Sequence, residues 1–443
     1  MNKREKALNN RDTFSSKFGF VVSCIGAALG LGNIWMFSYK LGTCGGAAFL
    51  IPYLLFVFLL GTTGLIGEFA LGRKFKAGSL VGIKKILENK NIKGIKVFSI
   101  IPVVGLFGIF VFYSVVVGWI LKYLFLSVSR QITKIDVNTY FDSFAGTSNS
   151  IFWLLLGIIL TLLVVCCGMS KGIEKLNKII MPLLLILFIG LTIRTLMMPG
   201  AMNGVNYLLQ PKWESLLKVD TWVMALGQAF FTVSLTGCGM VVYGSYVDEK
   251  FDLVSSAINI AIFDTIAALL AAFMIIPAVF AFGFDPASGP SLLFITMASI
   301  FKSIPYGNLI STLFFLSVLF AAISSSVSML EGPVEAVLSV KHMDRKKVSV
   351  IMCVICFVLA IPIAMSMKNF GEFTDFITII LSPTGAMIAA ISIFFLFKGD
   401  ILEEINKGSR FKLGKKFLYF AKFVFVPVSL LVIILGILYG GIG

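Results

Sequence analysis

Long hydrophobic runs separated by short polar segments extend along the whole chain. A run of about 20 apolar residues is long enough to cross the hydrocarbon core of a membrane as an α-helix. Eleven such runs occur, at residues 17–40, 45–72, 97–127, 151–168, 173–196, 219–246, 255–283, 307–339, 347–367, 374–397 and 417–440. The pattern predicts an all-α polytopic membrane protein in which residues 1–443 form a single transmembrane domain of eleven helices.

Composition and charge agree with this pattern and add an orientation. Hydrophobic residues make up 58% of the chain and charged residues 13%, whereas soluble domains hold about half and about a quarter. If the N-terminus is cytoplasmic, the cytoplasmic segments hold 28 of the 37 lysines and arginines. The positive-inside rule therefore predicts a cytoplasmic N-terminus and, because eleven is odd, an extracytoplasmic C-terminus.

The net charge of +15 follows from this topology and gives no support for a nucleic-acid partner. We expect the basic patches to face anionic membrane lipid instead. The short loops, which lack glycosylation sequons, fit a bacterial cell inner (plasma) membrane.

The residues that enzymes need for catalysis are almost absent. The single histidine, His342, lies in the basic turn "KHMDRKK" between the eighth and ninth runs, where a solvated loop position is expected. Six of the seven cysteines fall inside hydrophobic runs, so we expect no disulfide framework. The sequence has no nucleotide-binding loop and no Cys/His metal cluster. It therefore does not predict an enzyme.

Two hydrophobic runs are interrupted by glycine and polar residues near their centres. The first run contains "SCIGAALGLGNIW" at residues 23–35, and the sixth contains "GQAFFTVSLTGCG" at residues 227–239. Unwinding a helix at membrane depth frees N–H groups at one end and C=O groups at the other. Such breaks can bind a carboxylate beside an ammonium group or a small cation. Close helix packing at the glycines is the alternative explanation.

The positions of the two interruptions predict a repeat. Each interrupted run opens a set of five runs, which is typical of an inverted repeat with discontinuous helices 1 and 6. This five-plus-five organisation divides the chain into residues 11–196 and residues 219–397. Residues 398–443 then form a cytoplasmic loop and the eleventh helix.

Charged and hydroxyl side chains inside the runs are further candidates for function. Asp264, in "NIAIFDTIAALLAAF", lies well inside the seventh run, where a carboxylate is costly and by default functional. Ser324, Ser325 and Ser326 in the eighth run offer oxygens that suit a hard cation. A protonated packing role for the aspartate and hydrogen bonds from the serines to their own helix are the alternatives. Three more intramembrane carboxylates are interpreted as buried network or helix-contact residues: Glu68, Glu331 and Glu335.

These residues stand in motifs that resemble the neurotransmitter:sodium symporter family, in its bacterial amino-acid transporter branch. The resemblance covers about residues 11 to 400 and includes "GLGNIW", "GGAAFLIPY", "GEFALGR", "FYSVVVGW", "GMSKGIEKLNKIIMP", "GQAFFTVSL" and "AAISSSVSMLEGPVEA". It implies Na⁺-coupled symport of an amino acid into the cell by alternating access. Eleven spans instead of twelve resembles several bacterial members.

The resemblance also implies which residues bind substrate and sodium. The substrate carboxylate would meet the amides of Leu31 and Gly32 and the hydroxyl of Tyr113, and its ammonium would meet the carbonyls of Ala28, Phe231, Thr232 and Ser234. One sodium would be bound by Ala28, Asn33, Thr232, Asp264 and the substrate carboxylate, so that each ligand completes the other's site. A second sodium would be bound by Gly26, Leu29, Ala321, Ser324 and Ser325.

The substrate side chain would lie among Ile109, Tyr113, Phe231, Ser234, Gly237, Ser325 and Met329. Gly237 stands where relatives often have a bulky aromatic residue, which favours a large, aromatic amino acid such as tyrosine, tryptophan or phenylalanine. A looped backbone that refills this space is the alternative. Asp264 resembles the acidic residue that makes many bacterial members independent of chloride, and whether it binds sodium directly stays open.

Gate residues are implied in the same way, with two departures. Phe231 and Tyr113 would cover the substrate beside Gln228, and Gly172 and Pro182 resemble an element of the fifth span that unwinds. At the outer gate Met36 replaces the usual arginine partner of Asp375. At the inner gate Arg11 and Phe14 match the family, but Ser339 replaces the usual aspartate.

Other classes of protein remain as alternatives to a sodium symporter. A proton-coupled or exchange transporter of the same inverted-repeat fold would typically lack the Ser324 and Ser325 pair. A non-transporting amino-acid sensor would be expected to carry a long soluble appendage. The expected partners are the amino acid, sodium ions and membrane lipid, and a homo-oligomer is left open.

Overall fold

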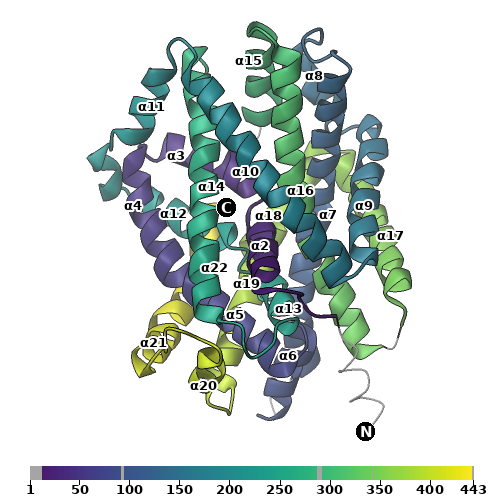
Figure 1. The fold of residues 1–443 in the computed structure, drawn as a ribbon, viewed down its shortest axis with the longest axis vertical. Helices are drawn as coiled ribbons and strands as arrows, with labels where there is room; N and C mark the ends of the chain where they lie inside the picture. Colours follow the sequence, from purple (N-terminus) through teal and green to yellow (C-terminus); the bar gives the residue numbers. More distant parts are fainter. Residues whose placement is uncertain (1–11, 91–93, 287–291, 342, 442–443) are drawn as a thin grey trace.

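The structure, a computed structural model, describes residues 12–90, 94–286, 292–341 and 343–441. These residues form helices and connecting turns, with no strand among them. Nine of the described helices are long and apolar enough to cross a membrane: Ala47–Phe75, Ile95–Val128, Ser148–Cys166, Met169–Leu196, Leu253–Ala281, Gly307–Val340, Arg345–Ala364, Met367–Leu396 and Lys415–Leu438. The bundle is elongated, and most of these helices run along its long axis (Figure 1).

The first predicted run forms a broken helix. It consists of α2 (Lys17–Ala28), followed after three residues by η1 (Gly32–Met36) and α3 (Phe37–Thr43), and the two halves are bent by 61°. The sixth run forms α12 (Val219–Thr232) and α13 (Gly239–Ser245), separated by residues 233–238. Both predicted interruptions are therefore confirmed, whereas the exact count of eleven crossings stays a prediction.

The remaining spans are continuous, and several contain wider π-helical turns. The unbroken ones are α7 (Ile95–Val128), α14 (Leu253–Ala281), α16 (Gly307–Val340) and α17 (Arg345–Ala364), with η3 (Ser148–Ser150) leading into α9 (Ile151–Cys166). Those with π-helical turns are α4 (Ala47–Phe56), η2 (Val57–Gly61) and α5 (Thr62–Phe75); η4 (Met169–Glu174) and α10 (Lys175–Leu196); α18 (Met367–Asp375), η7 (Phe376–Leu381), α19 (Ser382–Ile391) and η8 (Ser392–Leu396); and α21 (Lys415–Phe420), η9 (Ala421–Phe425) and α22 (Val426–Leu438).

Short helices cap the two ends of the bundle. Near one end lie α8 (Val137–Phe144), α11 (Ala201–Leu209) and α15 (Met297–Ser303), with η5 (Trp213–Leu217) and η6 (Leu292–Thr296) in the adjoining loops. Near the other lie α6 (Ser79–Glu88), α20 (Ile401–Asn406) and the start of the described chain (Figure 1). Loops expected on opposite sides of the membrane thus lie at opposite ends.

The broken helices lie inside a frame made by the longest continuous ones. The helices α7 and α16, each of 34 residues, pack against each other, and α16 also packs against α2 and α10. Polar side chains are fully buried here, among them Asn33, Thr232 and Asp264. Because buried polar groups need partners, their contacts locate the candidate site.

Candidate functional site

A cavity lies where the breaks of the first and sixth spans meet. The cavity has a volume of about 80 Å³. This is several times the ~10–15 Å³ that one water molecule needs. The walls come from both breaks and from α7, α16, α19 and α22: Ala27, Ala28, Gly30, Leu31, Gly32, Leu106, Ile109, Tyr113, Gly227, Phe230, Phe231, Ser234, Leu235, Thr236, Gly239, Met240, Ser325, Ser328, Met329, Thr378, Ser382, Pro383 and Val432. Nine of the eleven residues expected to bind substrate are among them.

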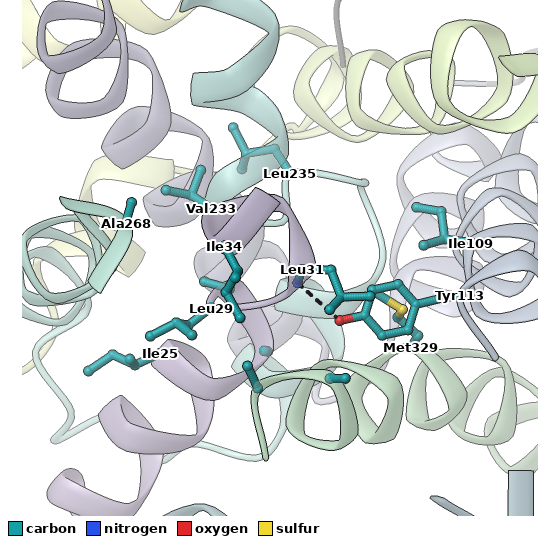
Figure 2. Packing of buried hydrophobic residues seen from close by; sticks show 14 of the residues in the cluster. Ile25, Leu29, Leu31, Ile34, Ile109, Tyr113, Val233, Leu235, Ala268 and Met329 are labelled. Carbon is teal, nitrogen blue, oxygen red and sulfur yellow. Dashed lines mark hydrogen bonds between the residues drawn. The ribbon is translucent and has the colours of Figure 1, made fainter. Parts of the chain in front are cut away.

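One side of the cavity presents backbone amides. Helix α2 ends when Leu29 turns extended (φ −72°, ψ 95°) and donates its N–H to Ile25 O at 2.7 Å. The next N–H groups therefore lie outside a regular helix, and Leu31 N donates to Tyr113 Oη at 3.3 Å (Figure 2). A Cβ on Gly32 would stand 2.7 Å from Phe231 Cδ1, so a glycine lets this ring lie against the break.

Beside these amides, three buried polar side chains form the first polar cluster, which we define as Asn33, Thr232 and Asp264. Asn33 Nδ2 donates to Asp264 Oδ1 at 2.7 Å and to Thr232 Oγ1 at 2.9 Å. Thr232 Oγ1 donates to Asp264 Oδ2 at 2.6 Å. The seventh span thus holds both breaks together through one carboxylate, at no more than 1% exposure for any of the three residues.

The second polar cluster consists of Gly26, Leu29, Asn177, Ser324 and Ser325. Ser325 Oγ lies 3.2 Å from both Gly26 O and Leu29 O and donates to them. Ser324 Oγ donates to Asn177 Oδ1 on α10. Ala321, expected here from the sequence, is buried one turn earlier on α16.

The oxygens of both clusters are of the kind that Na⁺ binds. The first cluster presents a carboxylate and a hydroxyl, and the second supplies backbone carbonyls and hydroxyls. The side-chain carbonyl of Asn33 accepts from Gly30 N at 3.2 Å. A hard cation takes such ligands in preference to nitrogen or sulfur. No group of three His, Cys, Asp or Glu residues suited to a metal occurs in the described part of the chain.

Two residues expected to bind substrate lie behind the cavity wall. Thr232 points to Asp264. Gly237 has φ +73°, and a Cβ there would collide with the backbone at Gly385 on α19. Its N–H donates to Glu68 Oε1 at 2.9 Å, and its carbonyl accepts from Ser79 Oγ at 2.5 Å. The looped backbone weighed as an alternative is the arrangement observed at this glycine.

Several wall residues were missed by the sequence reasoning. Leu106, Thr236 and Met240 line the cavity, as do Ser382 of α19 and Val432 of α22. Thr236 lies within the predicted interruption at residues 227–239 but was given no role. Ser382 and Val432 had no signal, because the start of α19 and the eleventh helix reach the cavity only through tertiary packing. Asn177 did have a signal, since it is a lone amide in an apolar helix.

The expected gate residues are dispersed. Phe231 lies against Gly32, and Gln228 Nε2 donates to Gly32 O at 3.2 Å. Phe14 is buried edge-on against Phe20 and Tyr243. Asp375 is exposed on α18. Arg11 lies outside the described residues.

An ion pair that motif reasoning did not identify closes the end of the bundle near the start of the chain. Arg345 of α17 donates to both carboxylate oxygens of Glu331, at 2.7 and 2.8 Å. Tyr246 Oη donates to the same carboxylate at 2.7 Å. Ser339, which the sequence resemblance implied as a replacement for an inner-gate aspartate, donates to Glu335. Glu331 therefore supplies a negative charge at this end, as a buried network residue.

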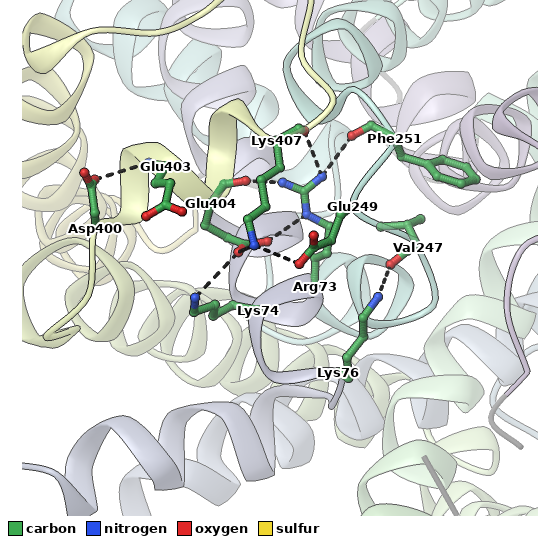
Figure 3. Close-up of polar contacts among 10 residues, drawn as sticks. All are labelled: Arg73, Lys74, Lys76, Val247, Glu249, Phe251, Asp400, Glu403, Glu404 and Lys407. Carbon is green, nitrogen blue, oxygen red and sulfur yellow. Dashed lines mark hydrogen bonds and ion pairs between the residues drawn. The ribbon is translucent and has the colours of Figure 1, made fainter. Parts of the chain in front are cut away.

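A second charged network joins the loops at this end (Figure 3). The buried Arg73 guanidinium donates to Glu404 Oε1 at 2.9 Å and to Phe251 O at 2.9 Å. Lys407 Nζ lies 2.7 Å from Glu249 Oε1 and 3.4 Å from Glu404 Oε2. The hydrogen bond to Glu249 raises the pKa of Lys407, and the same bond lowers the pKa of Glu249. The α20 helix is thereby fastened to the end of α5 and to the α13–α14 loop.

Known proteins are similar to this chain in sequence and in fold. Residues 11–148 and 133–439 match the sodium:neurotransmitter symporter family. An uncharacterized sodium-dependent transporter of Bacillus subtilis, YhdH, is 36% identical over 96% of this chain and 97% of its own. A second, MJ1319 of Methanocaldococcus jannaschii, is 31% identical over 93% and 87%. The crystal structure of MhsT in complex with L-phenylalanine has a TM-score of 0.86 at 35% identity, covering 96% of this chain and 100% of MhsT.

Proposed function

The chain belongs to the sodium:neurotransmitter symporter family, and from this premise we propose that it moves a large, aromatic amino acid into the cell together with Na⁺. The observation that supports this most directly is the adjacency of two kinds of group in one buried place. The backbone amides of the first break, where Leu31 N donates to Tyr113 Oη, adjoin the first polar cluster with its carboxylate. An amino acid and a cation need these two environments side by side.

The backbone at the breaks suits the common part of every amino acid. The substrate carboxylate binds at Leu31 N–H and Tyr113 Oη. The N–H groups at the break carry partial positive charge and have no acceptor within a helix. The substrate ammonium binds toward the carbonyls at the end of α2 and around Ser234, whose φ of +56° turns the chain at the second break. The substrate carboxylate then also binds the first sodium ion, so that the binding of substrate and the binding of sodium favour each other.

The walls beyond these groups suit a large apolar side chain with a polar tip. Leu106, Met240 and Val432 contribute apolar surface, while Thr236 and Ser382 contribute hydroxyls. Aromatic side chains bury large areas and tyrosine and tryptophan seek a hydrogen-bond partner. The bound L-phenylalanine in the similar MhsT structure supports an aromatic substrate for this chain as well.

Asp264 provides a fixed negative charge at the first sodium site, so transport is proposed to be independent of chloride. Alternating access then follows from the breaks, because two half-helices can tilt without stretching a continuous helix. We place residues 11–196 and 219–397 as the two inverted repeats, with the N-terminus cytoplasmic and the C-terminus extracytoplasmic.

Uptake into proteoliposomes tests the proposal. Purified protein is reconstituted, and uptake of labelled phenylalanine, tyrosine, tryptophan and leucine is followed under an inward Na⁺ gradient. We expect aromatic uptake that stops when choline replaces Na⁺ and continues when gluconate replaces chloride. Uptake that survives in choline would indicate a proton-coupled or exchange mechanism, and binding without uptake would indicate a sensor. Preference for leucine would reject the aromatic assignment alone.

A further inference from the structure

Asn177 is a polar side chain with no role in the function described so far. It lies in the first turn of α10, is 0% exposed, and faces the packing of α10 against both α2 and α16. An amide is costly in such a place unless its hydrogen-bonding groups are used. Its contacts therefore indicate what it does.

The orientation of the Asn177 amide is fixed by its own helix. Nδ2 donates to Ile173 O, one turn earlier, at 2.9 Å. A carbonyl oxygen cannot take that place, because it would face another acceptor. The Oδ1 end consequently faces α16, where it accepts the proton of Ser324 Oγ.

This bond distinguishes Ser324 from its neighbour Ser325. The Ser325 proton is directed at Gly26 O and Leu29 O, which are the carbonyls proposed to bind the second sodium. The Ser324 proton is directed away from those carbonyls, toward α10. A hydroxyl that donates to a third residue keeps both lone pairs for a cation.

The fit around Gly26 places Asn177 close to the same point. A Cβ on Gly26 would collide with both Ser324 Oγ and Asn177 Oδ1. The two oxygens thus adjoin the last turn of α2 before its break, and a small residue at position 26 is needed for them to do so. Asn177 lies behind the serine rather than in the cavity wall.

We infer that Asn177 is a positioning residue of the second sodium site, which holds the Ser324 hydroxyl with its lone pairs available to Na⁺. The inference rests on the proposed function, because it requires that sodium binds there. It means that a residue of α10 contributes to the affinity for sodium. The side chain acts through Ser324 and needs no contact with the ion.

Sodium-dependent thermal stability of the purified protein tests this role without transport. Midpoints of unfolding are measured at increasing NaCl, with choline chloride keeping ionic strength constant and no amino acid present. Asn177→Leu keeps the volume but removes the acceptor, and we expect it to raise the half-effective Na⁺ concentration about three- to tenfold. Asn177→Asp, protonated in this buried place, can donate to Ile173 O and keeps an acceptor for Ser324. We expect a half-effective Na⁺ concentration close to that of the unsubstituted protein.

Thr161→Val is the matched control. Thr161 of α9 makes the corresponding hydrogen bond to Ser326, at 2.8 Å, one residue beyond the sodium pair. We expect its Na⁺ response to be unchanged. If Asn177→Leu keeps the normal response, or if Asp and Leu weaken it equally, Asn177 has only a structural role. If Asn177→Leu does not yield folded protein, Asn177→Ser replaces it. A normal Na⁺ response with Asn177→Asp and a weakened response with Asn177→Ser then support the inference, and any other result rejects it. An unsubstituted protein that shows no Na⁺ response, together with no Na⁺-dependent uptake, would overturn the proposed function itself.

Discussion

The two polar clusters at the broken helices differ in how their buried polar groups are satisfied. The first contains a carboxyl group, and the donors of Asn33 and Thr232 satisfy both oxygens of Asp264. The second is built from neutral groups, and its hydroxyl protons go to carbonyl oxygens. In the first cluster side-chain donors take the electrostatic place of a cation. In the second cluster the Ser325 proton is directed at carbonyls that a cation would use, whereas the Ser324 proton is directed at Asn177.

This difference has a consequence for coupling. A buried ionised carboxylate is costly without a positive partner, so we expect a cation at the first cluster to be held strongly. A neutral oxygen shell binds a desolvated ion less strongly and releases it more readily. We therefore expect the first sodium to stay with the substrate, and the second sodium to leave when the fifth span moves.

The largest expected effect comes from removing the charge of the first cluster. Asp264→Asn keeps the shape, but it loses an interaction of roughly 4 kcal/mol, the value for unit charges about 4 Å apart at an effective dielectric constant of ~20. We expect the Na⁺ concentration for half-maximal uptake to rise on the order of a thousandfold, or uptake to become dependent on chloride. Uptake measured across Na⁺ and chloride series decides this. Unchanged sodium dependence would show that the aspartate only packs.

A methyl group at the second cluster should have the next largest effect. Gly26→Ala would force the added carbon against Ser324 Oγ and Asn177 Oδ1. Overpacking of this kind costs about 1–3 kcal/mol, so we expect sodium-dependent stabilisation to weaken about five- to 150-fold. Gly190→Ala is the control, because nothing lies within 4 Å of a Cβ there. Equal responses from the two variants would contradict the close fit.

The two serines should differ by a smaller amount. Ser324→Ala removes a hydroxyl held in place by Asn177, while Ser325→Ala removes one whose proton must first turn away from Gly26 O and Leu29 O. A hydrogen-bonding group contributes about 1 kcal/mol, or about fivefold. We expect Ser324→Ala to weaken the sodium response more. The reverse order in the same thermal titration would mean that Ser325 is the better oriented ligand.

The smallest effect is expected from a charge outside both clusters. Glu249 is exposed and pairs with Lys407, whose hydrogen bond lowers the pKa of the carboxyl below 4.5. A lowered folded-state pKa gives stability that is full above the unfolded value and is lost as pH falls through the folded value. Glu249→Gln should leave Na⁺ binding unchanged and flatten only the stability change below about pH 4.5. A sodium effect would show that this network communicates with the clusters.

Much of the fold could be read from hydrophobic pattern alone. Apolar runs of spanning length need no partner to be recognised, because the membrane rather than neighbouring residues selects them. The glycines of the first and sixth runs predicted both breaks for a similar local reason. The sequence resemblance also implied that Asn33, Thr232 and Asp264 lie together, and the structure brings them into contact from three spans. Their role in binding stays a prediction.

The sequence by itself thus determined the helices, the interruptions and the residue types that suit a carboxylate and sodium. Only the tertiary structure decided what surrounds them. The backbone of Gly237 turns into α19 instead of opening the pocket, and Val432 enters the cavity wall from the last helix. Asn177 meets Ser324 across 147 residues of sequence. Such contacts depend on how helices pack. The pattern of apolar and polar residues along one helix does not show which other helix will pack against it.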